Sequence, residues 1–178
     1  VANISVDFPL PDLVDTLAED TLPLDAERRA AVRRELDTKD AGGLRDAGGE
    51  AYLPLLYATG PFDQAIDTLA KIDVDGALGS RIIGLREIAA TIGDRARVTL
   101  DPTERHGFEY QSWFGFTLYG EGARVALGRG GTYTIKGSDE PATGFSLYMD
   151  PLLDALGGPD ADEREILFLP LGHDRDVG

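Results

Sequence analysis

Three segments in the second half of the chain combine acidic, aromatic and glycine residues in a way that composition alone does not explain. Glycines are typical of places where the backbone comes close to another group, and tyrosine and glutamate side chains can hydrogen-bond a ligand. A structural explanation is equally open, because tyrosines pack across strands and glycines serve turns and tight strand contacts. The three segments are residues 104–110, 128–133 and 141–147.

Conventional catalytic motifs are absent from the sequence. His106 and His173 are the only histidines, and neither lies in a recognisable nucleophile motif. There is no cysteine, which excludes disulfides and thiolate metal sites. Residues 73–76 superficially resemble a calcium loop, but its remaining ligand positions do not follow, so they are interpreted as a turn between helices. We therefore expect neither a metal site nor a cofactor.

In order and spacing, the three segments resemble motifs of the histidyl-tRNA synthetase family. There, an Arg-Gly-Leu-Asp-Tyr-Tyr, a Gly-Gly-Arg-Tyr-Asp and a Pro-Ala-Val-Gly-Phe segment line the amino-acid and ATP sites. Residues 36–40 are similar to a helix-end segment that lies upstream of these motifs in the family. The resemblance implies an α+β fold with an antiparallel sheet of the class II aminoacyl-tRNA synthetase catalytic-domain type and a helical half.

The chain departs from the family's motifs at positions where charge matters. His106 stands where the family has an arginine that handles carboxylate and phosphate, and a largely neutral imidazole cannot replace a bidentate guanidinium. Thr132 and Thr134 replace an arginine and an aspartate, while Tyr133 is kept, and Pro151 corresponds to the class II signature arginine. Without these cations, little would stabilise the charge that develops on ATP during adenylation. Adenylation by this chain is therefore not expected.

A retained scaffold without the arginines resembles the family's non-catalytic paralogue, a regulatory subunit of ATP phosphoribosyltransferase. The resemblance implies association with the short catalytic subunit, activation of the first step of histidine biosynthesis, a role in histidine feedback, and a homodimer within a hetero-oligomer. Two alternatives are a divergent histidyl-tRNA synthetase fragment and a stand-alone amino-acid-sensing domain. The candidate residues of a histidine-like pocket are His106, Glu109, Tyr110, Gly130, Gly131, Tyr133, Gly144 and Phe145.

The charge balance argues against a nucleic-acid partner, because such binding depends on Lys and Arg that neutralise phosphates. The 178 residues include 17 basic and 32 acidic side chains, for a formal net charge of -15. Arg28, Arg29, Arg33 and Arg34 cluster on one predicted helix, where a solvated face balanced by acidic neighbours is the simpler explanation. No apolar run approaches the roughly 20 residues that span a bilayer, and no signal-peptide pattern is present, so we expect a cytoplasmic protein.

The hydrophobic pattern changes once along the chain. Apolar residues recur every three or four positions within residues 12–93, which predicts helices, and alternate from residue 97 onward, which predicts a sheet to about residue 170. A hairpin is predicted between strands at residues 108–119 and 123–127, then a helix from Asp150 and a last strand at 166–169. Residues 1–171 are thus expected to form the C-terminal part of a class II synthetase-like domain, whose upstream part is missing, with residues 172–178 as a tail.

Overall fold

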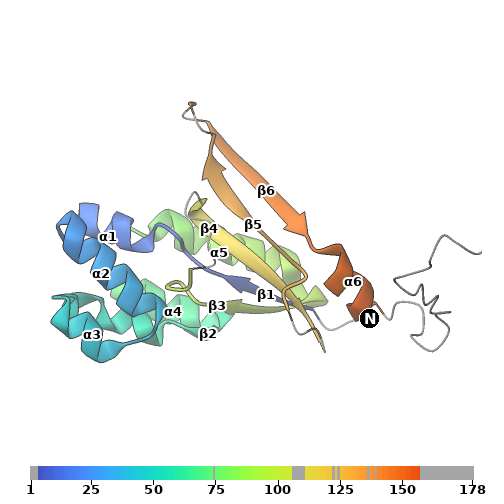
Figure 1. Cartoon of the computed structure of the whole chain (residues 1–178), viewed down its shortest axis with the longest axis horizontal. Coiled ribbons are helices and arrows are strands. Elements are labelled where there is room, and N and C mark those ends of the chain that lie inside the picture. The colour runs from blue at the N-terminus through green and yellow to red at the C-terminus, as the bar shows by residue number, and fades with distance from the viewer. Residues whose placement is uncertain are drawn as a thin grey trace, which may run out of the picture.

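The computed structural model describes residues 4–73, 75–105, 111–121, 123, 125–135, 137–138 and 140–156. Figure 1 shows one sheet with helices packed against it and a long hairpin, β5–β6, extending beyond the helices. The strands are β1 Ile4–Phe8, β2 Gly60–Pro61, β3 Arg97–Leu100, β4 Gln111–Gly120, β5 Gly128–Thr134 and β6 Pro141–Leu147. The helices are α1 Leu13–Asp20, α2 Ala26–Asp37, α3 Ala41–Asp46, α4 Phe62–Ile72, α5 Gly79–Ile92 and α6 Met149–Ala155, with 3₁₀ turns η1 Glu50–Tyr57 and η2 Gly93–Arg95.

The six strands lie in the order β2-β3-β1-β4-β5-β6. Only β1 and β3 run parallel, and every other neighbouring pair is antiparallel. The predicted α+β fold with a mostly antiparallel sheet is therefore confirmed. The first strand of the chain lies in the middle of this sheet, between strands that follow it by about ninety residues or more.

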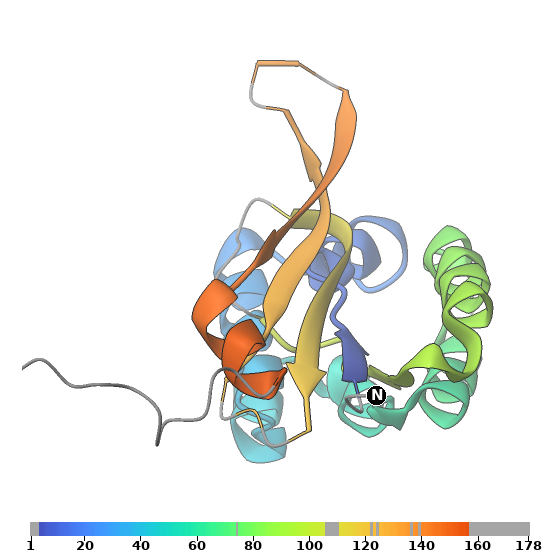
Figure 2. The same ribbon diagram turned by 90° about the vertical axis from the view of Figure 1, so that its right-hand side faces the viewer.

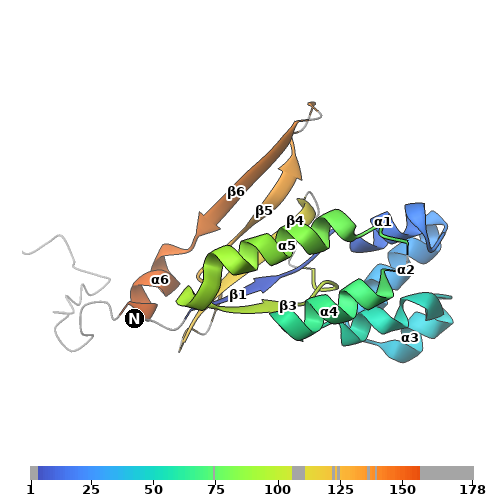
Figure 3. The ribbon, with the colours of Figure 1, turned by 180° about the vertical axis from the view of Figure 1, so that it is seen from behind.

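The core lies between the helices and one face of the sheet. Figure 3 shows α4 and α5 crossing in front of β1 and β3. Phe8 of β1 meets the ring of Phe62 from α4 at 6.2 Å and that of Phe114 from β4 at 6.1 Å, both edge to face. Leu69 and Leu85, one on each helix, are fully buried in this layer. The predicted helical periodicity is confirmed for both helices, and Gly93 ends α5 with a positive φ of 54°.

Arginine side chains of α2 form ion pairs with acidic residues of the same chain. Arg29 lies 3.1 Å from Asp15 of α1, and Arg33 contacts the same carboxylate. Arg34 pairs with its neighbour Glu35 at 2.7 Å. These ion pairs support the structural explanation of the arginine cluster and attach α2 to α1.

The predicted hairpin is correct in kind but wrong in its second strand. Residues 123–127, which alternate in the sequence, form no strand where they are described, and the partner of β4 is the glycine-rich β5. The reason is the close approach of the strands: a Cβ on Gly130 would fall 2.5 Å from the main-chain oxygen of Gly144, so glycine is needed there. The strand predicted at 166–169 and the tail at 172–178 lie outside the described residues.

Candidate functional site

A depression of about 410 Å³ lies where β4, β5 and β6 run side by side. The structure brings five of the eight predicted site residues together around it, and His106, Glu109 and Tyr110 lie outside the described residues. The sequence analysis missed three further lining residues. Within the described part of the chain, the lining consists of Gln111, Arg129, Gly130, Gly131, Tyr133, Gly144, Phe145 and Ser146.

The glycines around the depression have two different structural reasons. A Cβ on Gly131 would lie 2.6 Å from the main-chain oxygen of Phe114, so this glycine, like Gly130, allows β4, β5 and β6 to approach. A Cβ on Gly144 would instead meet only the ring of Tyr133, at an ordinary contact distance of 3.4 Å. Gly144 is therefore the glycine at which a side chain would occupy the depression rather than break the sheet.

The two aromatic residues of the predicted site belong to opposite faces of the sheet. Every second residue of β5 points to the same face of the sheet, so Tyr133 shares a face with Gly131 and Arg129. The ring of Tyr133 reaches Gly144 on β6. Phe145 pairs with Gly130, whose own Cβ position points at the ring of Phe116, on the helix-covered face. The side chain of Phe145 is 69% exposed. Tyr133 is thus the aromatic side chain on the same face as Arg129.

A row of polar residues crosses five strands on this face. Residues in register on adjacent strands share a face, and the pairings Asp7–Thr99, Asp7–Thr117, Thr117–Arg129 and Arg129–Ser146 join neighbouring strands one after another. The hydroxyl of Thr99 donates to Asp7, and Thr117 is 1% exposed. Their strand neighbours Val6, Phe8, Leu100 and Phe116 pack in the core on the other face. The sheet therefore separates an apolar face from a polar one.

Among the described residues that line the depression, Arg129 is the only charged one. Its guanidinium donates a hydrogen bond to the hydroxyl of Tyr119, a half-buried residue of β4. Burial raises the pKa of Tyr119, and the nearby Glu104 raises it further. The Nε of Arg129 is buried and has no hydrogen-bond partner within the described part of the chain. The polar row thus contains a cation whose guanidinium is hydrogen-bonded to a tyrosine with a raised pKa.

Next to Asp7 of the row lies Glu104, a carboxyl group with a raised pKa. Burial is the main cause that raises the pKa of Glu104 to about 7, followed by a hydrogen bond with Asp7 and the charges of Asp7 and Asp101. Lys39 acts in the opposite direction. Burial and the neighbouring carboxylate of Asp7 thus both favour the protonated form of Glu104.

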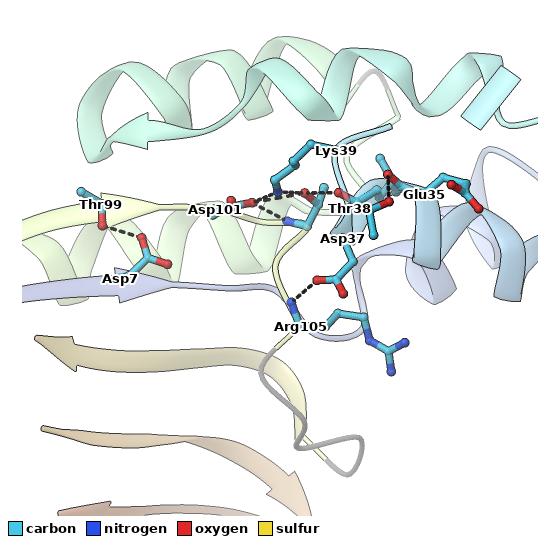
Figure 4. Close-up of polar contacts among 10 residues, drawn as sticks. Asp7, Glu35, Asp37, Thr38, Lys39, Thr99, Asp101 and Arg105 are labelled. Atoms are coloured by element: carbon cyan, nitrogen blue, oxygen red, sulfur yellow. Dashed lines mark hydrogen bonds and ion pairs between the residues drawn. The ribbon is translucent and has the colours of Figure 1, made fainter. Parts of the chain in front are cut away.

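Residues 36–40, singled out in the sequence, hold the loop that leads to residue 106 (Figure 4). Lys39 adopts a positive φ of 58° and places its Nζ 2.6 Å from Asp101 Oδ1 and 2.5 Å from Thr103 Oγ1. The main-chain N–H of Arg105 donates to Asp37 Oδ1 at 2.9 Å. The end of α2 thereby fixes residues 101–105, immediately before the predicted site residues His106, Glu109 and Tyr110.

Two positions that the motif resemblance aligns with arginines of the family can be located. The hydroxyl of Thr132 contacts the main-chain oxygen of Ser112 across the β4–β5 pair, so it serves the sheet. Pro151 lies in the first turn of α6. Within the described residues there is no group of three or more acidic or histidine side chains suited to a metal ion, nor a helix long and apolar enough to cross a membrane.

The mostly antiparallel sheet with its polar, glycine-lined depression defines a class II synthetase-like domain. The family model described as histidyl-tRNA synthetase matches residues 1–152. The chain belongs to this family.

Among its relatives, the chain is similar to proteins named ATP phosphoribosyltransferase regulatory subunit. It is 34% identical to the one from Rhodospirillum centenum over 96% of its own length and 45% of the relative, and 36% identical to that from Paramagnetospirillum magneticum over 98% and 47%. The chain thus spans about half the length of the curated relatives it matches.

Solved structures show the same fold. An ATP phosphoribosyltransferase regulatory subunit/histidyl-tRNA synthetase from Bacillus halodurans superposes with a TM-score of 0.70 at 23% identity, covering 88% of this chain and 45% of that one. The ATP phosphoribosyl transferase (HisG:HisZ) complex from Thermotoga maritima gives 0.65 at 14% identity, over 84% and 54%.

The sequence contained a signal for Asp7 and Thr117 of the polar row but not for the missed lining residue Arg129. In residues 4–8 and 116–118 apolar and polar side chains alternate, which places Asp7 and Thr117 on the face opposite the core. Arg129 is flanked by glycines, so it has no apolar neighbours to reveal the alternation.

Proposed function

We propose that the chain is part of a regulatory subunit of ATP phosphoribosyltransferase. It associates with the short catalytic subunit, raises its activity and contributes to its inhibition by histidine. The names of relatives that are 31–36% identical over 93–98% of the chain support this assignment. The chain acts in the cytoplasm as a homodimer within a hetero-oligomer, and it performs no chemistry itself.

The main observation against aminoacylation is that a threonine stands where the second motif of the family has an arginine. Thr132 stands in its place, and its hydroxyl is engaged by the main chain of β4 rather than directed to a ligand. A threonine held in this way cannot supply the positive charge that adenylation requires. The depression between β5 and β6 is retained, which suits a site that binds an amino acid without activating it.

The test is to titrate the purified protein into the short catalytic subunit and follow the formation of phosphoribosyl-ATP with and without histidine. We expect the rate to rise with added protein and histidine to reverse the increase. An unchanged rate and an unchanged histidine response would contradict the proposal. Histidine-dependent exchange of pyrophosphate into ATP would then support a divergent synthetase fragment, and its absence a stand-alone amino-acid-sensing domain.

A further inference from the structure

We propose that Glu104 and Asp7 share one proton between their carboxyl groups and thereby fasten the 101–105 loop to the middle of the sheet. Loss of this proton to water leaves two adjacent carboxylates, which repel each other and loosen the loop. The pair is therefore a pH-sensitive latch. It goes beyond the proposed function and does not depend on it, because it rests on contacts within this chain.

One carboxylate oxygen of Asp7 needs a hydrogen-bond donor. Asp7 lies on β1 in the middle of the sheet, and its Oδ1 accepts a hydrogen bond from the hydroxyl of Thr99 on β3. Its Oδ2 is buried and receives no hydrogen bond from another group in the described part of the chain. Glu104 lies within hydrogen-bonding reach of Asp7. A carboxylate only accepts hydrogen bonds, whereas a protonated carboxyl group donates one, so a proton on Glu104 supplies the donor.

Burial and like charge both favour the proton on Glu104. Burial is the largest cause that raises its pKa to about 7, followed by the hydrogen bond with Asp7 and the charges of Asp7 and Asp101. Lys39 acts in the opposite direction, but its Nζ is held by Asp101 Oδ1 at 2.6 Å and by Thr103 Oγ1 at 2.5 Å. The groups that face Glu104 or its neighbours are Asp7 of β1, Asp101 of the loop itself, Lys39 after α2, Tyr119 of β4 and, hydrogen-bonded to Tyr119, Arg129 of β5.

Other contacts attach the loop at its two ends. The main-chain N–H of Asp101 donates to the oxygen of Phe8 at 3.1 Å, which holds the start of the loop beside β1. The N–H of Arg105 donates to Asp37 Oδ1 at 2.9 Å, which holds its end beside α2. Glu104 lies between these attachments, and its side chain reaches Asp7. Loss of the proton should therefore loosen residues 103–105 locally and leave the sheet intact.

Proton linkage gives the size of the effect. The closed loop holds the pKa of Glu104 at about 7, and in an open loop it returns to its ordinary value of 4.5. The closed form is thus stabilised at low pH, and this contribution is lost as the pH rises through 7. With these two values, the open form should be about 10-fold more populated at pH 8 than at pH 6.

The experiment combines two NMR measurements on the intact 178-residue chain. Carboxyl-carbon shifts followed from pH 4 to 9 report the titration of Glu104, whose signal is the one missing in Glu104→Gln. Hydrogen-exchange protection factors, which correct for the intrinsic effect of pH on exchange, report the opening of the loop at the N–H groups of Thr103 and Arg105. Both groups are hydrogen-bonded in the closed loop. The amides of α4 report whether the rest of the fold opens as well.

We expect the Glu104 signal to titrate near pH 7 and the protection at Thr103 and Arg105 to fall about 10-fold between pH 6 and 8. Protection in α4 should stay constant. In Glu104→Gln the amide donates to Asp7 in place of the proton and cannot ionise, so protection of the loop should not depend on pH.

Two further variants serve as tests of the pair. Asp7→Asn removes the like charge and offers a donor, so the midpoint of the Glu104 titration should move to lower pH. Glu87→Gln is the matched control, because Glu87 is exposed on α5, and it should behave as the unaltered chain.

The inference is overturned if Glu104 titrates at its ordinary value, or if loop protection depends on pH equally in Glu104→Gln. His106 follows the loop and histidine titrates in the same range, so His106→Gln is measured as well. A pH dependence that disappears only in His106→Gln would also overturn the latch. Circular dichroism shows whether each variant is folded, and if Asp7→Asn is not, Glu104→Gln decides.

Discussion

The guanidinium of Arg81 reaches Asp12 across 69 positions of the sequence and contacts both carboxylate oxygens, Nε to Oδ1 at 3.2 Å and Nη2 to Oδ2 at 2.7 Å. The same Oδ2 accepts the main-chain N–H of Trp113 at 2.9 Å. Trp113 has a positive φ of 65° beside the irregularity of β4, a conformation that costs a bulky residue free energy. Asp12, which directly precedes α1, therefore contacts both α5 and the irregular part of β4.

Replacing this carboxylate should be costly. In Asp12→Asn the amide keeps the shape but loses the charge that Arg81, 11% exposed at its side chain, depends on. We expect a loss of about 2 kcal/mol in the free energy of unfolding, less than for a fully buried pair because Asp12 is 24% exposed. Urea denaturation measures it. The exposed ion pair between Arg86 of α5 and Asp67 of α4 offers a control. Asp67→Asn should change the free energy of unfolding by less than about 0.5 kcal/mol. Equal effects of the two changes would contradict the role of Asp12.

The glycines of the depression should separate into two groups. Gly130→Ala and Gly131→Ala place a methyl group 2.5 or 2.6 Å from main-chain oxygens, so the sheet must open and we expect losses of several kcal/mol or no folded protein. Gly144→Ala meets only the Tyr133 ring at 3.4 Å and should leave the melting temperature unchanged or slightly higher. Thermal denaturation distinguishes the groups, and a large loss in Gly144→Ala would show that this glycine is also structural.

The same Gly144→Ala variant should weaken a ligand of the depression. Its methyl group would occupy space beside Tyr133 and close to Arg129. A reduced affinity for histidine, the ligand that the proposed function implies, with an unchanged melting temperature is the expected result. Unchanged affinity would place the ligand away from β6.

The Lys39 contact with the 101–105 loop should contribute modestly to stability. Lys39→Met removes an ion pair with Asp101 whose side chains are 38% and 22% exposed, so we expect a loss of about 1 kcal/mol. The effect should appear locally as faster hydrogen exchange at the N–H of Thr103, which donates to Asp101 Oδ1. Lys71→Met, on the exposed face of α4, is the control. Exchange at Thr103 that stays slow would mean that the loop holds without Lys39.

Stability should depend on pH through Glu104. Its pKa is about 7 in the folded chain and 4.5 ordinarily, so the folded state binds the proton more tightly than the unfolded state. This contribution is fully present below about pH 4.5 and is lost as the pH rises through 7. The melting temperature of the unaltered chain should therefore fall by a few degrees between pH 5 and 8 relative to Glu104→Gln, which cannot ionise. Parallel pH profiles would contradict this, and Glu87→Gln, exposed on α5, should follow the unaltered chain.

Local patterns predicted most of the helices and half of the sheet. Helices α1, α2, α4 and α5 follow from apolar residues at helical spacing, and Asp25 caps α2 through the N–H of Arg28 as expected from its type. β5 was missed because strand prediction relies on β-branched and aromatic side chains, which Gly128, Gly130 and Gly131 do not have. Glycine is required at Gly130 and Gly131 because the neighbouring strands come too close for a Cβ, and this packing is not visible in the sequence.

The candidate site was found in part for a similar reason. The motif resemblance indicated the glycines and Tyr133, which the depression brings together. It could not indicate Arg129, because that position becomes chemically significant only once the register aligns it with Thr117 and Asp7. The pairing of Lys39 with Asp101 also joins segments 62 positions apart, and no local rule connects them.

One of the two outer strands of the described sheet, β6, affects how readily the protein self-associates. β2 is an outer strand of two residues, whereas β6 has seven, and Figure 2 shows the β5–β6 hairpin standing clear of the helices. Phe145 and Leu147 of β6 are exposed, and no lysine or arginine occurs between positions 140 and 156 to discourage pairing. Such an edge adds extended chains through main-chain hydrogen bonds whatever their sequence. The storage life of the purified chain will therefore depend on concentration, and a molecule that covers β6 will act as a solubiliser even where it leaves the melting temperature unchanged.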